Sequence, residues 1–310
     1  MSLIAALGAL ETGLIFALVA LAVFISFRVL NFPDLTVDGS FPLGGAVCAT
    51  LISAGSDAYL ATLVGTLSGA LAGFATGWLN VRLKILHLLA GILVMTAMFS
   101  INLRIMGRPN VPLLDEVTVF TPFQSDSFPA HIAVPVVMAV LVALLILLLR
   151  YFLGTELGQA LRAVGSNPRM ASAQGISTSA MTLLGLSISN GLAGLAGALF
   201  VQSSGGADVS MGIGVVIIGL AAVIGGEALL PSRSLLLSIF GCVLGAIAYR
   251  FAIALALNLE WIGLKAQDLN LVTALLIVLA LSLPQVRQRL WTRSQKVVAQ
   301  QVQRYGRATR

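Results

Sequence analysis

The stretch that decides the fold is the polar segment at residues 154–176, GTELGQALRAVGSNPRMASAQGI, in the middle of the chain. Its pattern predicts two short helices. Gly165 can adopt the left-handed conformation that ends the first helix, Asn167 can cap the second with Pro168 in its first turn, and Gly175 can follow its end. Apolar residues recur at helical spacing on the first helix, which indicates one face for a partner. The spacing alone fits an ordinary interfacial loop helix equally well.

The rest of the chain has the composition of a membrane protein. Hydrophobic residues make up 58% of the 310 positions and charged residues only 10%, with a mean hydropathy of +1.00. Charged residues typically make up about 25% of a soluble domain. Since a spanning helix needs about 20 apolar residues, we expect an all-α polytopic membrane protein with about eight to ten transmembrane helices. We assign residues 1–285 to a transmembrane domain that contains a cytoplasmic loop at 153–179, and 286–310 to a basic cytoplasmic tail.

The apolar runs predict where the spans lie. The first run follows a start that contains Glu11 but no Lys or Arg, so we expect it to stay in the membrane and not to be removed as a signal peptide. The second is expected to begin at Ser40 as cap, with Pro42 in its first turn, and is short enough to be discontinuous or tilted. The expected spans are 10–29, 40–53, 57–79, 85–103, 130–152, 180–202, 211–229, 234–257 and 269–283.

The basic residues predict the orientation. The net charge is +6, and most Lys and Arg fall on one side of the predicted spans. These are Arg28, Arg82, Lys84, Arg150, Arg162, Arg169, Arg233 and the tail residues, whereas Arg104, Arg108 and Lys265 fall on the other side. The side richer in Lys and Arg is the cytoplasmic one. Residues 154–176 are therefore expected in the cytoplasm, and the proline-containing acidic segment 104–129 outside, as a docking surface.

Two features of the apolar segments indicate how the helices are arranged. Glycines recur every fourth residue at Gly65, Gly69, Gly73 and Gly77, which predicts a groove for close helix packing. The sequences DGSFPLG at 38–44 and DVSMGIG at 208–214 share the spacing Asp-x-Ser-x-x-x-Gly before apolar helices. They would enter the membrane from opposite faces, which is typical of inverted repeats whose helix N-termini suit a carboxylate-bearing solute. Because only three residues match, chance similarity is the alternative.

No set of catalytic residues is apparent. The chain has no phosphate-binding loop and no His-Glu-x-x-His, and His87 and His131 stand alone. Cys48 and Cys242 lack partners at metal-ligand spacing. We therefore expect no enzyme activity and no cofactor in this chain. Arg250 is the clear candidate for an intramembrane charge, either as a pathway residue or as a snorkelling or paired arginine.

Three stretches carry a resemblance to a known family. The run Gly-x-x-Leu-Arg-Ala-x-Gly-x-Asn-Pro-x-x-Ala-x-x-x-Gly-Ile at 158–176 resembles the cytoplasmic coupling loop of permease subunits of bacterial ABC importers, in the branched-chain amino acid and ribose permease group. LNFPDLTVDGSFPLGG at 30–45 and the glycine-rich region 185–226 fit the same group. The TVDGSFP wording resembles a narrower branch of tryptophan/tyrosine-type or uncharacterised ABC permeases. The resemblance spans most of residues 20–285.

The resemblance implies a multi-pass permease subunit of an ATP-driven importer in the bacterial inner membrane. It would translocate a small solute, such as an amino acid or similar small carboxylate, by alternating access. The implied partners are ABC ATPase subunits that carry ATP and Mg²⁺, a periplasmic or lipid-anchored solute-binding protein, a second permease and membrane lipid, with no nucleic acid. The second permease is expected to be an identical copy, with a different permease chain as the alternative. An ion-coupled secondary transporter and a passive channel remain the alternatives.

The resemblance also assigns roles to residues. The coupling residues that would contact the ATPase are Glu156, Leu157, Gly158, Leu161, Arg162, Asn167, Pro168, Ala171 and Gly175. The start of the pathway-lining segment falls on Asp38, Ser40, Phe41 and Pro42, and the internal repeat adds Asp208 and Ser210.

Overall fold

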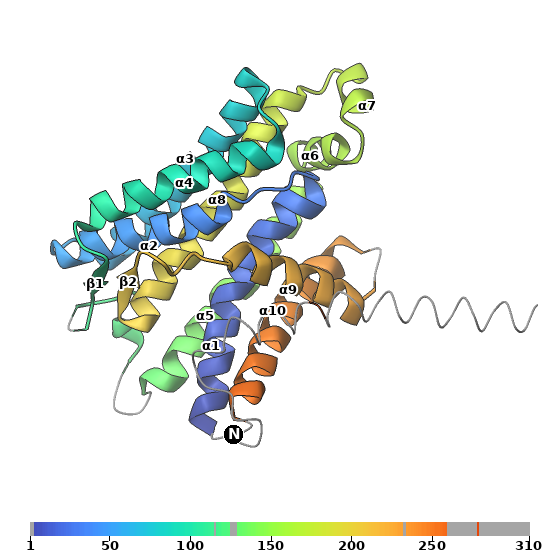
Figure 1. Cartoon of the computed structure of the whole chain (residues 1–310). Helices are drawn as coiled ribbons and strands as arrows, with labels where there is room; N and C mark the ends of the chain where they lie inside the picture. Colours follow the sequence, from blue (N-terminus) through green and yellow to red (C-terminus); the bar gives the residue numbers. More distant parts are fainter. Residues whose placement is uncertain (1–2, 115, 125–128, 232–233, 259–277, 279–310) are drawn as a thin grey trace, which may run out of the picture.

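The architecture is an all-α bundle of long and short helices, as predicted (Figure 1). A computed structural model describes residues 3–114, 116–124, 129–231, 234–258 and 278. The predicted span 269–283, apart from residue 278, and the tail 286–310 lie outside the described residues. The helices are α1 (Leu3–Val23, extended by the π-helical turn η1, Phe24–Val29), α2 (Val37–Ser53), α3 (Ala58–Leu83), α4 (His87–Met106), α5 (Ala130–Gly154), α6 (Glu156–Ser166), α7 (Pro168–Ala173), α8 (Thr178–Ser204), α9 (Val215–Leu229) and α10 (Leu235–Asn258).

Six helices of the described part are long and apolar enough to cross a membrane, and two apolar helices are shorter. The long ones are α1 with η1, α3, α4, α5, α8 and α10. The short ones, α2 and α9, have 17 and 15 residues. At 1.5 Å per residue a helix of this length reaches roughly 22–26 Å, less than the roughly 30 Å of hydrocarbon.

The core is built around α1 and a tight helix pair. The α1 backbone from Gly13 to Val23 is buried, and α5, α8, α9 and α10 pack around it. The predicted glycine groove on α3 is confirmed, because α3 packs along α8 at backbone distance. A Cβ atom at Gly73 would collide with the carbonyl oxygen of Leu186 on α8. Replacing this glycine would therefore separate the two helices.

The second predicted span was wrong in its start. The α2 helix begins at Val37 with Thr36 as N-cap residue, and Ser40 lies inside the helix. Two contacts account for this, a local one just before the helix and a long-range one from within it. The Asp34 carboxylate accepts a hydrogen bond from the amide of Thr36, two residues on, at 2.9 Å, and the Thr36 carbonyl oxygen accepts from the amides of Gly39 and Ser40. The Ser40 hydroxyl instead donates to Asn190 Oδ1 of α8 at 2.7 Å.

The predicted span 211–229 was wrong in its length. The α9 helix begins only at Val215, because Gly214 has φ +81° and breaks the helical path. Residues 209–214 form turns that lead from β2 (Gly206–Asp208) to α9. The crossing predicted for this region is therefore a short helix that starts within the bundle.

The short helices α2 and α9 run in opposite directions from adjacent starting points (Figure 1). The α2 helix runs toward the small sheet that β1 (Asn110–Pro112) forms with β2. The α9 helix runs toward η1, where Glu227 forms an ion pair with Arg28 at 2.6 Å. Each follows a long helix, α1 or α8, and a non-helical return. This arrangement has the form expected of inverted repeats.

The repeated Asp-x-Ser-x-x-x-Gly motif is not what relates these two helices. Asp38 lies in the first turn of α2, whereas Asp208 lies in β2, ahead of the turns that precede α9. The Asp208 carboxylate accepts hydrogen bonds from the amide and the hydroxyl of Ser210. The two motifs therefore occupy different structural positions, although the helices that follow them correspond.

Candidate functional site

The polar segment forms the two helices that the sequence predicts. The Thr155 hydroxyl accepts a hydrogen bond from the Gly158 amide at the start of α6, and Asn167 Oδ1 accepts from the Met170 amide at the start of α7. Pro168 is the first residue of α7, and Gly175 has φ +82° just after its end. The predicted conformations of Asn167, Pro168 and Gly175 are confirmed.

The conformation predicted for Gly165 was wrong. Gly165 lies within α6, which ends at Ser166, and the extended residue Asn167 breaks the helix instead. A glycine is needed here for a different reason. A Cβ atom at this position would collide with the carbonyl oxygen of Val29 and lie 2.9 Å from Leu30 Cα. The α6 helix therefore packs directly on the backbone at the end of η1.

The predicted coupling residues divide between two faces. Gly158, Leu161 and Ala171 are buried against the membrane helices. The Leu161 side chain packs on Gly185 of α8, so closely that a Cβ atom added to this glycine would lie 2.9 Å from Leu161. The opposite face is exposed and contains Glu156, Leu157, Arg162, Asn167, Pro168 and Gly175. Residues of the first group hold the two helices on the bundle, so only the second group is available to a partner.

Sequence reasoning missed Met170 on this exposed face. Its side chain is 62% exposed, and that of Leu157 is 54% exposed. Two large apolar side chains in water are unusual in a short polar segment, and such residues are typical of protein interfaces. The signal available in the sequence was the one large apolar side chain of the six-residue helix PRMASA.

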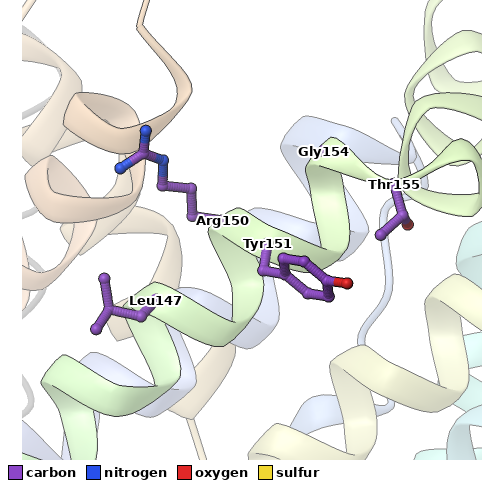
Figure 2. Close-up of a pocket in the computed structure, with 5 residues that line it drawn as sticks. All are labelled: Leu147, Arg150, Tyr151, Gly154 and Thr155. Carbon is purple, nitrogen blue, oxygen red and sulfur yellow. The ribbon is translucent and has the colours of Figure 1, made fainter.

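A shallow hollow lies where α5 meets α6. Leu147, Arg150, Tyr151, Gly154 and Thr155 line about 440 Å³ of space. Figure 2 shows Arg150 and Tyr151 pointing away from each other on α5. The Tyr151 side chain is 76% exposed. This hollow is part of the open surface beside the coupling helices and not an enclosed chamber for a solute.

The break between α1 and α2 is held by buried polar side chains. Asn190 of α8 donates from Nδ2 to Asp34 Oδ2 at 2.6 Å and accepts from Ser40 at 2.7 Å. The Thr36 and Thr76 hydroxyl oxygens are 2.6 Å apart. All five side chains belong to fully buried residues. The break is therefore a defined structure, fixed by hydrogen bonds to α3 and α8.

The start of α9 receives its cap from α2. The Val216 amide donates to Asp38 Oδ1 at 2.7 Å, while the Val215 amide donates to the Gly212 carbonyl oxygen at 3.3 Å. At the start of α2, Asp34 accepts from the amide of the N-cap residue Thr36, and the amides of residues 38–40 donate to backbone carbonyl oxygens. The N-terminus of α9 thus holds a carboxylate of the chain itself, and the predicted binding of a solute carboxylate there does not fit this contact.

The other predicted pathway residues lie around α2. The Phe41 ring is fully buried, 5.9 Å from the Phe16 ring and 5.6 Å from the Phe200 ring between centroids. Pro42 lies against the turn before α9, where a Cβ at Gly212 would be 2.6 Å from Pro42 Cδ. The residues from 38 to 42 are therefore brought together with α9, whereas Asp208 and Ser210 contact each other beside the small sheet.

Arg250 lies inside the bundle on α10. Its guanidinium carbon is 3.8 Å from the centroid of the Phe16 ring, a cation–π contact between α10 and α1. The Nε atom is buried without a hydrogen-bond acceptor among the described residues. The interpretation of Arg250 as a snorkelling arginine does not fit this position, since the guanidinium lies on the buried Phe16 ring.

The sequence matches the protein family described as "Branched-chain amino acid transport system / permease component" over residues 5–281. The chain belongs to this permease family. It is the membrane-spanning permease subunit of an ABC importer, as the resemblance of its coupling loop implied. Subunits of this kind transport and are not themselves catalytic.

Relatives with named substrates are similar to this permease over most of their length. The "Tyrosine transport system permease protein" of Clostridioides difficile is 39% identical over 267 residues, which cover 86% of each chain. The galactofuranose transporter permease of Escherichia coli is 32% identical, over 68% of this permease and 61% of the relative.

A solved structure has a similar fold. "PsaBC from Streptococcus pneumoniae in complex with Fab" superposes with a TM-score of 0.50 at 15% identity, covering 88% of this permease and 89% of the other chain. At this identity the likeness concerns the fold alone.

Proposed function

We propose that this permease imports an amino acid or a similar small carboxylate across the bacterial inner membrane, driven by ATP hydrolysis on a partner. The tyrosine transport permease of Clostridioides difficile supports this substrate class, because its similarity extends over 86% of both chains. The similarity to a galactofuranose permease covers less of either protein. An amino acid is therefore favoured over a sugar.

The observation that carries the proposed coupling is the exposed face of α6 and α7. Leu157 and Met170 are more than half exposed, and Arg162 is exposed beside them. An ATPase subunit that binds ATP and Mg²⁺ would cover this face. Because α6 packs on the backbone of Val29 and Leu30, a displacement of α6 is passed directly to the break between α1 and α2.

The remaining partners follow from the same family architecture. An identical second permease would complete the pathway, and a periplasmic or lipid-anchored solute-binding protein would dock on the opposite end of the molecule. That end includes the small sheet, and Val119 there is held by Gln202 Oε1 of α8 at 2.9 Å. Closure of the ATPase dimer on ATP would then switch the pathway between outward and inward access.

Co-purification with the ATPase tests the docking face. We expect Leu157→Asp combined with Met170→Asp to abolish ATPase binding, because two desolvated apolar contacts become charged. Leu114→Asp is the matched control, since Leu114 is 84% exposed on the segment that follows β1. Leu161→Asp is unsuitable because Leu161 is buried and the substitution would damage packing. ATPase binding that survives the double substitution would contradict the assignment.

Uptake into proteoliposomes distinguishes the alternatives. Tyrosine uptake that requires ATP and the ATPase subunit is expected. An ion-coupled carrier would instead transport under an ion gradient without ATP, and a channel would equilibrate the solute without energy. Ribose supplied with its own binding protein is the control for substrate class.

A further inference from the structure

The α9 helix cannot cap its own N-terminus. Its N-cap residue is Gly214, which has no side chain, so a side-chain acceptor for the first turn of the helix must come from elsewhere. Asp38 supplies that acceptor from α2, at 2.7 Å from the Val216 amide. The two residues are 178 positions apart in the sequence. A helix of one half of the chain is thus capped by a helix of the other.

The same carboxylate also lies in the first turn of α2. A negative charge at a helix N-terminus is favourable, and here one charge is near two N-termini. The backbones are equally close: a Cβ at Gly212 would collide with the Asp38 carbonyl oxygen. Pro42 has no N–H to bond that carbonyl within α2, which leaves the oxygen facing the turn before α9.

Both short helices are also anchored near α6. The α2 helix is tied through Ser40 and Asn190 to Asp34 in the break that follows η1. The far end of α9 is tied to η1 by the ion pair between Glu227 and Arg28. A displacement at η1 therefore reaches α2 at its start and α9 at its end. The hydrogen bond from Val216 to Asp38 connects the start of α9 to the start of α2.

We propose that Asp38 is a positioning residue that makes α2 and α9 move as one unit when the coupling helix α6 moves. This inference rests on the proposed function in that ATP hydrolysis drives the movement. Without the negative charge of Asp38, the two helices move separately, and hydrolysis continues without productive opening of the pathway. The consequence is a loss of coupling and not a loss of assembly.

The test uses the full complex of permease, ATPase and binding protein in proteoliposomes, with tyrosine as solute. Asp38→Asn keeps the size of the side chain and one acceptor oxygen but removes the charge. We expect solute transported per ATP to fall on the order of tenfold, with hydrolysis changed by less than about twofold. The matched control is Asp57→Asn, because Asp57 caps α3 within its own helix, at 2.7 Å from the Tyr59 amide.

A second readout separates this inference from the proposed function. Hydrogen exchange of the amides at 214–216 in the purified permease should accelerate in Asp38→Asn and remain unchanged in Asp57→Asn. If ATP does not drive uptake by the wild type, the proposed function fails. If ATP drives uptake and Asp38→Asn keeps wild-type stoichiometry or wild-type exchange, the inference is overturned.

If Asp38→Asn does not accumulate in the membrane, Gly212→Ala tests the proposed joint movement of α2 and α9. It keeps the carboxylate but forces the two helix starts apart. Reduced transport per ATP in this variant supports the inference, and wild-type transport per ATP overturns it.

Discussion

Asn190 shows how much depends on a single amide within the bundle. It is fully buried, donates to Asp34 and accepts from Ser40, so that one side chain joins α8, the break and α2. We predict that Asn190→Leu lowers the free energy of unfolding by about 3 kcal/mol, because Asp34 loses a hydrogen-bond donor and stays buried. Thermal unfolding of the detergent-solubilised permease measures the change.

Ser189→Ala is the neighbouring control for this prediction. The Ser189 hydroxyl donates to the Ala22 carbonyl oxygen at 2.7 Å, a hydrogen bond between neutral groups. Its removal should cost about 1 kcal/mol. Equal losses in the two variants would show that the Asp34 carboxyl does not depend on Asn190.

At the scale of residues, the sequence predicts local contacts better than distant ones. Asn167, Pro168 and Gly175 have the predicted conformations because each acts within a few positions of itself. Ser40 and Gly165 do not, because their surroundings come from α8 and η1. The spacing of residues within one segment cannot predict which distant helix will pack against it.

At the scale of elements, the packing of α6 on η1 is sensitive to one added methyl group. We predict that Gly165→Ala lowers the free energy of unfolding by about 2 kcal/mol, because the added methyl meets the Val29 carbonyl oxygen and must push α6 away from η1. Circular dichroism during heating measures the change. Gly154→Ala is the matched control, because a Cβ at Gly154 has no atom within 4 Å. If both variants unfold alike, the contact between α6 and η1 carries no stability.

The existence of the elements follows from hydropathy, whereas the ends of the short helices do not. The long spans appear close to their predicted positions because about 20 apolar residues leave few other arrangements. The start of α2 follows a contact between Asp34 and the Thr36 amide just before the helix, and the start of α9 depends on a cap that Asp38 supplies from α2. A side chain of one helix that caps another helix can be recognised only when the positions of both helices are known.

In the whole molecule, the short helices α2 and α9 are placed like corresponding helices of inverted repeats. Each starts inside the bundle, and together they run to opposite ends. The sequence suggested inverted repeats through a motif that is not structurally equivalent, yet the arrangement of helices has that form. Hydropathy did not show this symmetry, because it predicted the second short helix as the longer span 211–229.

The orientation of the molecule gives a last prediction, because the distribution of basic residues predicts that α6 lies in the cytoplasm. Ser166 at the end of α6 and Glu116 near the small sheet are both exposed. A membrane-impermeant thiol reagent should modify Glu116→Cys in intact spheroplasts and Ser166→Cys only after permeabilisation. The native Cys48 and Cys242 are buried, so the wild type is the unlabelled control. Modification of Ser166→Cys from outside would place α6 beyond the reach of a cytoplasmic ATPase, and the coupling face would lose its partner.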